Sequence, residues 1–177
     1  MPTFLKNRDM KFSFHLLLTC IALTACGESG KTTADYRIVP RPGEIAPGDG
    51  GDVELDARTR IVCTGDGDGM RANAEFLAGY VESVVGSAPE ITGPDGLCDD
   101  GRAVILRADA PGKGGEAYEI EVSENRITVS GESDAGVFYG IQTLRKAMGA
   151  AKAAKVLFPA VRIADEPYLG YRGVMLD

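Results

Sequence analysis

The stretch from Ser133 to Met148 constrains the fold of this chain more than any other. Its apolar residues recur at helical spacing and form one stripe, made of Val137, Ile141, Leu144 and Met148. Beside that stripe lie Gly136 and Gly140, and each glycine costs a helix roughly 1 kcal/mol relative to alanine. Because local stability cannot explain them, we predict that another backbone, that of a sheet, comes unusually close. Ser133 or Asp134 should supply the N-cap.

The other strongly patterned segments predict an α+β fold, a small sheet with helices packed on one face. A second helix is expected from Met70 to Val85, with Arg71 and Glu75 as an exposed pair. The continuous apolar run from Ala103 to Leu106 is typical of a strand covered on both faces. Alternating residues then predict a hairpin around a turn at residues 123–125, and the helix that follows can lie over its apolar face.

Weaker signals complete the expected domain. Val53 and Leu55 alternate with polar residues, and a strand is expected from Thr59 to Thr64. The prolines in Tyr36–Pro42 favour an extended edge segment, and Val156–Ile163 is expected to form a final one. The turn-rich stretches 43–52, 86–101 and 109–116 are predicted to be loops.

Composition and charge exclude some partners. The 44% of apolar residues can bury a real core, and the formal net charge of −7 argues against nucleic acid. We expect no cofactor and no metal. Residues 65–69 alternate Asp and Gly but lack the remaining ligands of a calcium loop, and no cysteine pair has zinc-ligand spacing. Cys63 and Cys98 could form a disulfide or remain small buried thiols, and the sequence leaves both possibilities open.

The first 25 residues have the order of a bacterial lipoprotein signal. Basic residues precede the apolar run Phe12–Ala22, which is too short to span a bilayer. Leu23-Thr24-Ala25-Cys26 then resembles the lipoprotein box, in which the cysteine is acylated and becomes the mature N-terminus. An ordinary signal peptide with an incidental cysteine is the alternative. We expect a lipid-anchored protein of the cell envelope, periplasmic or at the cell surface, with residues 26–35 as a polar tether.

Removal of the signal deletes three basic residues and one acidic one, so the net charge falls from −7 to −9. An acidic surface gains nothing from anionic headgroups, so the lipid itself is expected to be the anchor. At the other end of the sequence, Pro167 marks a linker, and residues 171–177 have the apolar content of a new strand. We therefore expect this chain to stop inside a larger protein.

Three segments, in order, resemble the family-20 glycoside hydrolases, the β-N-acetylhexosaminidases. Ile38–Pro42 is similar to the start of the family, Gly136–Leu144 to the helix of its N-terminal accessory domain, and Tyr171–Asp177 to the opening strand of its catalytic barrel. Residues 168–170 depart from the Arg and aromatic residue common after the proline. The resemblance implies an accessory domain over 36–165, and in 166–177 the linker and first strand of an incomplete (β/α)8 barrel.

The resemblance also implies an activity, the removal of terminal N-acetylhexosamine from glycans by retaining hydrolysis. In this family the acetamido oxygen of the sugar attacks the anomeric carbon, an Asp orients the acetamido group, and a Glu protonates the leaving oxygen. That Asp-Glu pair lies later in the barrel, so the present segment should be inactive without the missing barrel. Arg172 matches the family's arginine for the outer sugar hydroxyls, or else closes the first strand by a salt bridge. Asp177 either contacts sugar or holds a loop.

Two other functions remain open. One is a non-catalytic surface lipoprotein module for glycan binding or adhesion. The other is the activity of another glycosidase family with a similar accessory domain, such as the α-glucuronidases. The sequence Arg172-Gly173 followed by Met175–Asp177 argues against that family.

Overall fold

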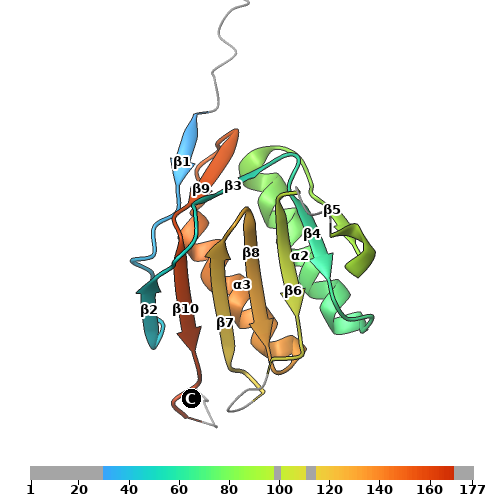
Figure 1. The fold of residues 1–177 in the computed structure, drawn as a ribbon, viewed down its shortest axis with the longest axis vertical. Helices are drawn as coiled ribbons and strands as arrows, with labels where there is room; N and C mark the ends of the chain where they lie inside the picture. The colour runs from blue at the N-terminus through green and yellow to red at the C-terminus, as the bar shows by residue number, and fades with distance from the viewer. Residues whose placement is uncertain (1–29, 98–100, 111–114, 170–177) are drawn as a thin grey trace, which may run out of the picture.

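The computed structural model describes residues 30–97, 101–110 and 115–169. Within them the chain forms two sheets and two α-helices (Figure 1). The elements in chain order are β1 (Lys31–Thr33), β2 (Glu44–Pro47), β3 (Val53–Asp56), β4 (Arg60–Cys63), α2 (Asp68–Val85), β5 (Glu90–Thr92), the 3-10 turn η2 (Pro94–Gly96), β6 (Ala103–Arg107), β7 (Tyr118–Ser123), β8 (Arg126–Gly131), α3 (Asp134–Met148), β9 (Lys155–Phe158) and β10 (Val161–Asp165).

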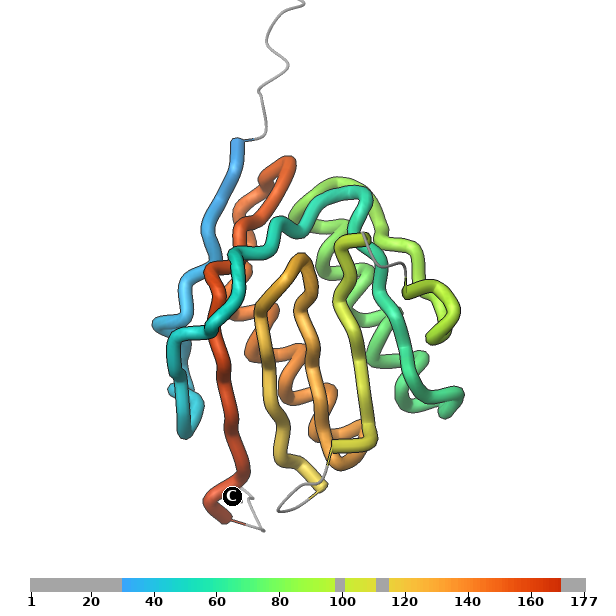
Figure 2. Tube along the Cα trace, in the orientation of Figure 1, coloured from blue at the N-terminus to red at the C-terminus, as the bar shows by residue number. Residues whose placement is uncertain are grey.

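The larger sheet has seven strands in the order β2-β10-β7-β8-β6-β4-β5. Strands β8, β6, β4 and β5 run parallel, whereas β7 is antiparallel to both β8 and β10. Both helices lie on one face of this sheet (Figure 1), which confirms the predicted α+β class. A second sheet, with the order β1-β9-β3, was not foreseen. It joins β1 to β9, which lie side by side although they come from the two ends of the described chain (Figure 2).

The contact between α3 and the hairpin β7–β8 explains the two helical glycines. A Cβ atom on Gly136 would collide with the backbone carbonyl oxygen of Ala117, and one on Gly140 would lie 2.5 Å from Cγ1 of Val129. The predicted close approach of helix and sheet is therefore confirmed. The N-cap is Ser133, whose side-chain oxygen accepts a hydrogen bond from the backbone N–H of Ala135 at 3.1 Å.

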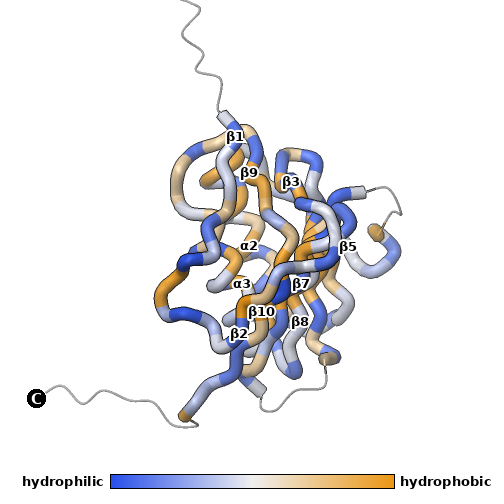
Figure 3. Tube along the Cα trace, turned by 60° about the vertical axis from the view of Figure 1, so that its left-hand side comes forward, coloured by the Kyte–Doolittle hydropathy of each residue, from blue (hydrophilic) through white to orange (hydrophobic). Residues whose placement is uncertain are grey.

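The core lies between the two helices and the face of the sheet that they cover. Alternate residues of the central strands point into it, and apolar segments follow these strands in Figure 3. The largest fully buried side chains from the sheets and helices include Leu55, Ile61, Leu77, Leu106, Ile120, Ile127, Ile141, Leu144 and Phe158. Helix α2 begins two residues before the predicted start and ends as predicted at Val85, where Gly86, with φ 86°, is the C-cap. Arg71 and Glu75 form the expected exposed ion pair, at 3.1 Å.

The predicted edge segment Tyr36–Pro42 contains no strand. The backbone N–H of Arg37 donates to the carboxylate of Asp35 at 3.0 Å, and each proline lacks a donor, so little remains for pairing with a strand. The segment is held instead by its side chains, because Ile38 is buried and the Tyr36 hydroxyl donates to the Pro159 carbonyl oxygen at 2.8 Å.

Three other predictions were also wrong. Residues 156–163 were expected to form one edge segment, but they belong to two strands of different sheets. Strand β10 lies inside the larger sheet, between β2 and β7. Within the predicted tether, Lys31–Thr33 pairs with β9. The predicted loops contain β2 and β5, whose four and three residues are too short to show a clear alternation. The lipoprotein signal, Cys26, Cys98 and the predicted barrel strand lie outside the described residues.

Replacement of Gly136 by alanine should destabilise this chain by about 2 kcal/mol, because the added methyl meets backbone that cannot swing aside. Gly79 is the matched control, since it is an exposed glycine in the middle of α2 with nothing within 4 Å of an added Cβ. Gly79→Ala should stabilise by about 1 kcal/mol. Urea unfolding followed by circular dichroism measures both, and equal effects of the two substitutions would contradict the close contact.

Candidate functional site

A cavity of about 660 Å³ opens at one end of the larger sheet. Its walls come from the end of β8, the start of β7 and the end of β10, together with the residues before β2 and Glu166–Tyr168 after β10. Strand direction places these pieces together, because β7 is antiparallel to both of its neighbours. The cavity thus lies where the described chain leaves the domain.

The cavity lining is rich in carboxylates, with Arg41 as its basic side chain among the described residues. The acidic lining residues are Glu44, Glu119, Glu132, Asp165 and Glu166. Asp165 has a structural role. One of its carboxylate oxygens accepts from the backbone N–H of Gly43 at 3.0 Å, and the other accepts from the Tyr118 hydroxyl at 3.4 Å. These bonds tie the end of β10 to the segment before β2 and to β7.

Tyr118 extends this hydrogen-bonded group into the core. Its hydroxyl lies 2.6 Å from Oγ1 of Thr143, so β7 and α3 are joined by a buried hydrogen bond. Burial raises the pKa of Tyr118 to about 12, so the phenol keeps its proton at neutral pH and cannot serve as a base there.

Three carboxyl groups among the described residues have displaced pKa values, which bears on whether any of these three could act as a general acid in glycoside cleavage. A general acid for glycoside cleavage needs a carboxyl group with a raised pKa. The three carboxyl groups with displaced values shift the other way. Hydrogen bonds from Arg37 lower the pKa of Asp35 to about 2, those from Lys31 and Lys155 lower the pKa of Glu54 to about 2, and one from Arg107 lowers that of Asp109.

No candidate metal cluster and no membrane-spanning helix occurs within the described ranges. There, no three side chains of His, Cys, Asp or Glu come together in a way that could hold a metal ion. Neither described helix is long and apolar enough to cross a membrane. Cys63 is a buried free thiol, and burial raises its pKa.

The sequence-predicted site residues are not brought together here, because Cys26, Arg172 and Asp177 lie outside the described residues. The structure adds Tyr118, Thr143 and Asp165, which the sequence analysis did not select as a group. Tyr118 lies 25 residues from Thr143 and 47 residues from Asp165 in the sequence, so no local sequence pattern links the three. The one available hint was a polar hydroxyl, that of Thr143, on the helix face predicted to meet a sheet.

Comparison with known proteins supplies the family context. Residues 35–166 match the model of glycosyl hydrolase family 20, domain 2. The chain is similar to a β-N-acetylhexosaminidase of Cellulomonas fimi, with 28% identity over 81% of this chain and 28% of that protein. It is also similar to a β-hexosaminidase of Porphyromonas gingivalis, with 29% identity over 94% of this chain and 23% of that protein. The chain thus spans about a quarter of the length of these curated relatives.

A solved structure agrees at the level of the fold. The family-20 β-N-acetylhexosaminidase from Streptomyces coelicolor superimposes with a TM-score of 0.66 at 24% identity. The match covers 77% of this chain and 28% of that one. It supports the arrangement of sheet and helices described above.

The ion pairs of Glu54 predict an acid-dependent loss of stability. Its pKa is depressed in the folded protein from 4.5 to about 2, so its contribution is present above pH 4.5 and is lost as the pH falls toward 2. Glu54→Gln should therefore flatten the decline of unfolding free energy in this window. Urea unfolding at a series of pH values measures it. The control is Glu121→Gln, on the exposed face of β7, and a decline unchanged in Glu54→Gln would refute the assignment.

The hydrogen bond between Tyr118 and Thr143 should be energetically coupled. Tyr118→Phe leaves the buried Thr143 hydroxyl without this partner, so we expect a loss of about 1–2 kcal/mol in unfolding free energy. In the double variant with Thr143→Val, the two losses should not add. A double-mutant cycle by urea unfolding gives the coupling, and strict additivity would show that the bond contributes nothing.

Proposed function

This chain belongs to glycosyl hydrolase family 20, and we propose that it is the N-terminal part of an exo-β-N-acetylhexosaminidase that removes terminal N-acetylhexosamine from glycans. The observation that carries the proposal is the match of residues 35–166 to a domain of this family. The similarity to the β-N-acetylhexosaminidase of Cellulomonas and the β-hexosaminidase of Porphyromonas supports it. Because the chain spans about a quarter of these relatives, the catalytic barrel is proposed to follow Asp177.

The described domain is proposed to be an accessory unit without a reaction centre of its own. Its displaced carboxyl pKa values are all lowered, which suits ion pairs and not proton donation. Its acidic cavity lies beside the point where β10 leads toward the barrel. In this scheme the acetamido oxygen of the substrate attacks the anomeric carbon, and the departing glycan oxygen takes a proton from a glutamic acid of the barrel.

Arg172 is the proposed contribution of this segment to substrate binding. A guanidinium group offers five donors in a rigid fork, which suits adjacent sugar hydroxyls. Its place in Tyr171–Asp177, the proposed opening strand, would put it on the catalytic barrel and not on the accessory domain.

Cys26 is the proposed site of lipid attachment. Basic residues, a short apolar run and Leu23-Thr24-Ala25-Cys26 follow one another in the order of a lipoprotein signal. The enzyme would then be held at the bacterial cell envelope, facing the periplasm or the exterior, where glycan substrates are found.

The full-length protein should hydrolyse 4-nitrophenyl N-acetyl-β-glucosaminide, whereas purified Cys26–Asp177 should not, since it lacks the acid and most of the pocket. Release of nitrophenol by both proteins, measured at equal concentration, tests this prediction. Turnover by the isolated segment would place a reaction centre inside it, and no turnover by the full-length protein would contradict the proposed activity.

Arg172→Ala in the full-length enzyme should lower kcat/KM by about 100-fold, the effect of losing two charge-assisted hydrogen bonds. Arg162→Ala is the control, because Arg162 is an exposed arginine of β10. Unfolding temperatures separate the two possible roles. A lower unfolding temperature with unchanged kcat/KM would mean that Arg172 closes the barrel strand and does not bind sugar.

A further inference from the structure

Strand β1 is an edge strand with few contacts to stabilise it. Its residues, Lys31–Thr33, pair in parallel with Lys155–Leu157 of β9, and β1 is the outer strand of the small sheet. They include no apolar side chain, so docking of β1 buries little apolar surface. Backbone hydrogen bonds must therefore supply most of the stability that opposes the loss of conformational entropy.

A buried hydroxyl opposes the docking of β1. Oγ1 of Thr32 is shielded from solvent and has no hydrogen-bond partner among the described residues. A buried polar atom without a partner destabilises the state in which it is buried, whereas water satisfies it once the strand is released. The adjacent Thr33 is exposed, so its hydroxyl can bond to water while β1 is docked.

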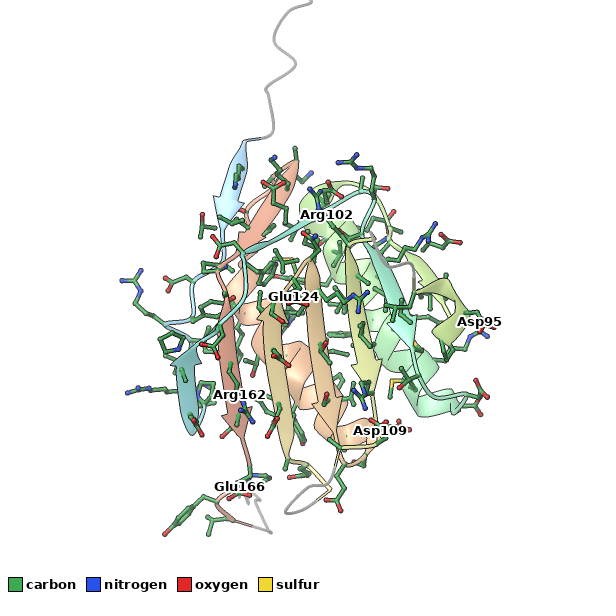
Figure 4. All side chains as sticks on the ribbon, in the orientation of Figure 1. Asp95, Arg102, Asp109, Glu124, Arg162 and Glu166 are labelled. Atoms are coloured by element: carbon green, nitrogen blue, oxygen red, sulfur yellow. The ribbon has the colours of Figure 1, made fainter. Side chains whose placement is uncertain are left out.

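The ion pair of β1 can be given up without leaving a carboxylate unpaired. Nζ of Lys31 lies 2.9 Å from the carboxylate of Glu54, and the Lys31 side chain is 43% exposed. The same carboxylate lies 3.1 Å from Lys155 and 3.4 Å from Arg102. Figure 4 shows Arg102 toward the end of the domain that holds β1. When Lys31 moves into solvent, Glu54 therefore keeps two cations.

The residues that follow β1 set a limit to its release. Ala34 and Ile38 are buried, so they hold the chain to the core. The backbone N–H of Asp35 donates to the carbonyl oxygen of Ala147, the next-to-last residue of α3, at 2.9 Å. The segment that can detach is therefore short and has a fixed end.

We propose that β1 is a releasable strap that sets the length of the tether between the lipid and the domain. The inference rests on the proposed acylation of Cys26. With β1 docked, five residue steps separate Cys26 from Lys31, and they span at most roughly 17 Å. With β1 released, the free chain extends to Ala34, and the three additional steps lengthen its reach by roughly 10 Å. The strap thus changes how far the domain, and the barrel proposed to follow it, can stand from the membrane.

Hydrogen exchange of the mature full-length protein carrying Cys26→Ser, followed by mass spectrometry, tests the strap apart from the lipid. Amides of β1 should exchange faster than those of α3 and more slowly than those of a synthetic peptide of residues 27–35. Thr32→Val should slow the exchange of β1 about fivefold, because it replaces the unpartnered hydroxyl by a methyl group of similar size.

Thr33→Val is the matched control, since it makes the same substitution in the same strand at an exposed position. It should change the exchange of β1 by about twofold at most. Exchange as slow as that of α3 would mean a fixed strand, and exchange at the rate of the synthetic peptide would mean a strand that does not dock. Either result, or equal effects of the two substitutions, would overturn the proposal.

The mass of the native N-terminal peptide judges the acylation of Cys26 separately. Failure of the lipid anchor and failure of the strap can therefore be distinguished.

Discussion

Helix α3 can lie on the hairpin β7–β8 only because Gly136 and Gly140 present no side chain to it. This contact decides which face of the larger sheet is covered and how near the helix lies to the strands. It also brings Thr143 within 2.6 Å of the Tyr118 hydroxyl, and Tyr118 in turn contacts Asp165 at the end of β10. The geometry where the chain leaves the domain thus depends on two glycines in one helix.

The same arrangement separates the two ends of the domain. Strand order and direction place the starts of β4 and β6 with the short sheet that contains β1, and the end of β10 with the acidic cavity. The proposed anchor and the proposed barrel would therefore attach at opposite ends. This domain would then act as a spacer between membrane and catalytic barrel.

Elements with strong periodicity could be predicted from the sequence. The α2 and α3 helices, the hairpin and the buried strand β6 all have patterns that local physics explains. Strands β2 and β5 could not be found, because three or four residues carry too little alternation. Pairing of β1 with β9 depends on contacts over more than a hundred residues, and so does the hydrogen bond from Gly43 to Asp165. The predicted site residues Cys26 and Arg172 remain predictions.

The mass of the intact protein extracted from native membranes tests the central claim most directly, because that claim joins this domain to a lipid and to a barrel. We predict a chain that starts at an acylated Cys26 and continues beyond Asp177 by roughly 250 residues, the length of a (β/α)8 barrel. A mass equal to that of a chain ending at Asp177 would contradict the account. The family relationship would then describe the fold of a stand-alone module and not an enzyme.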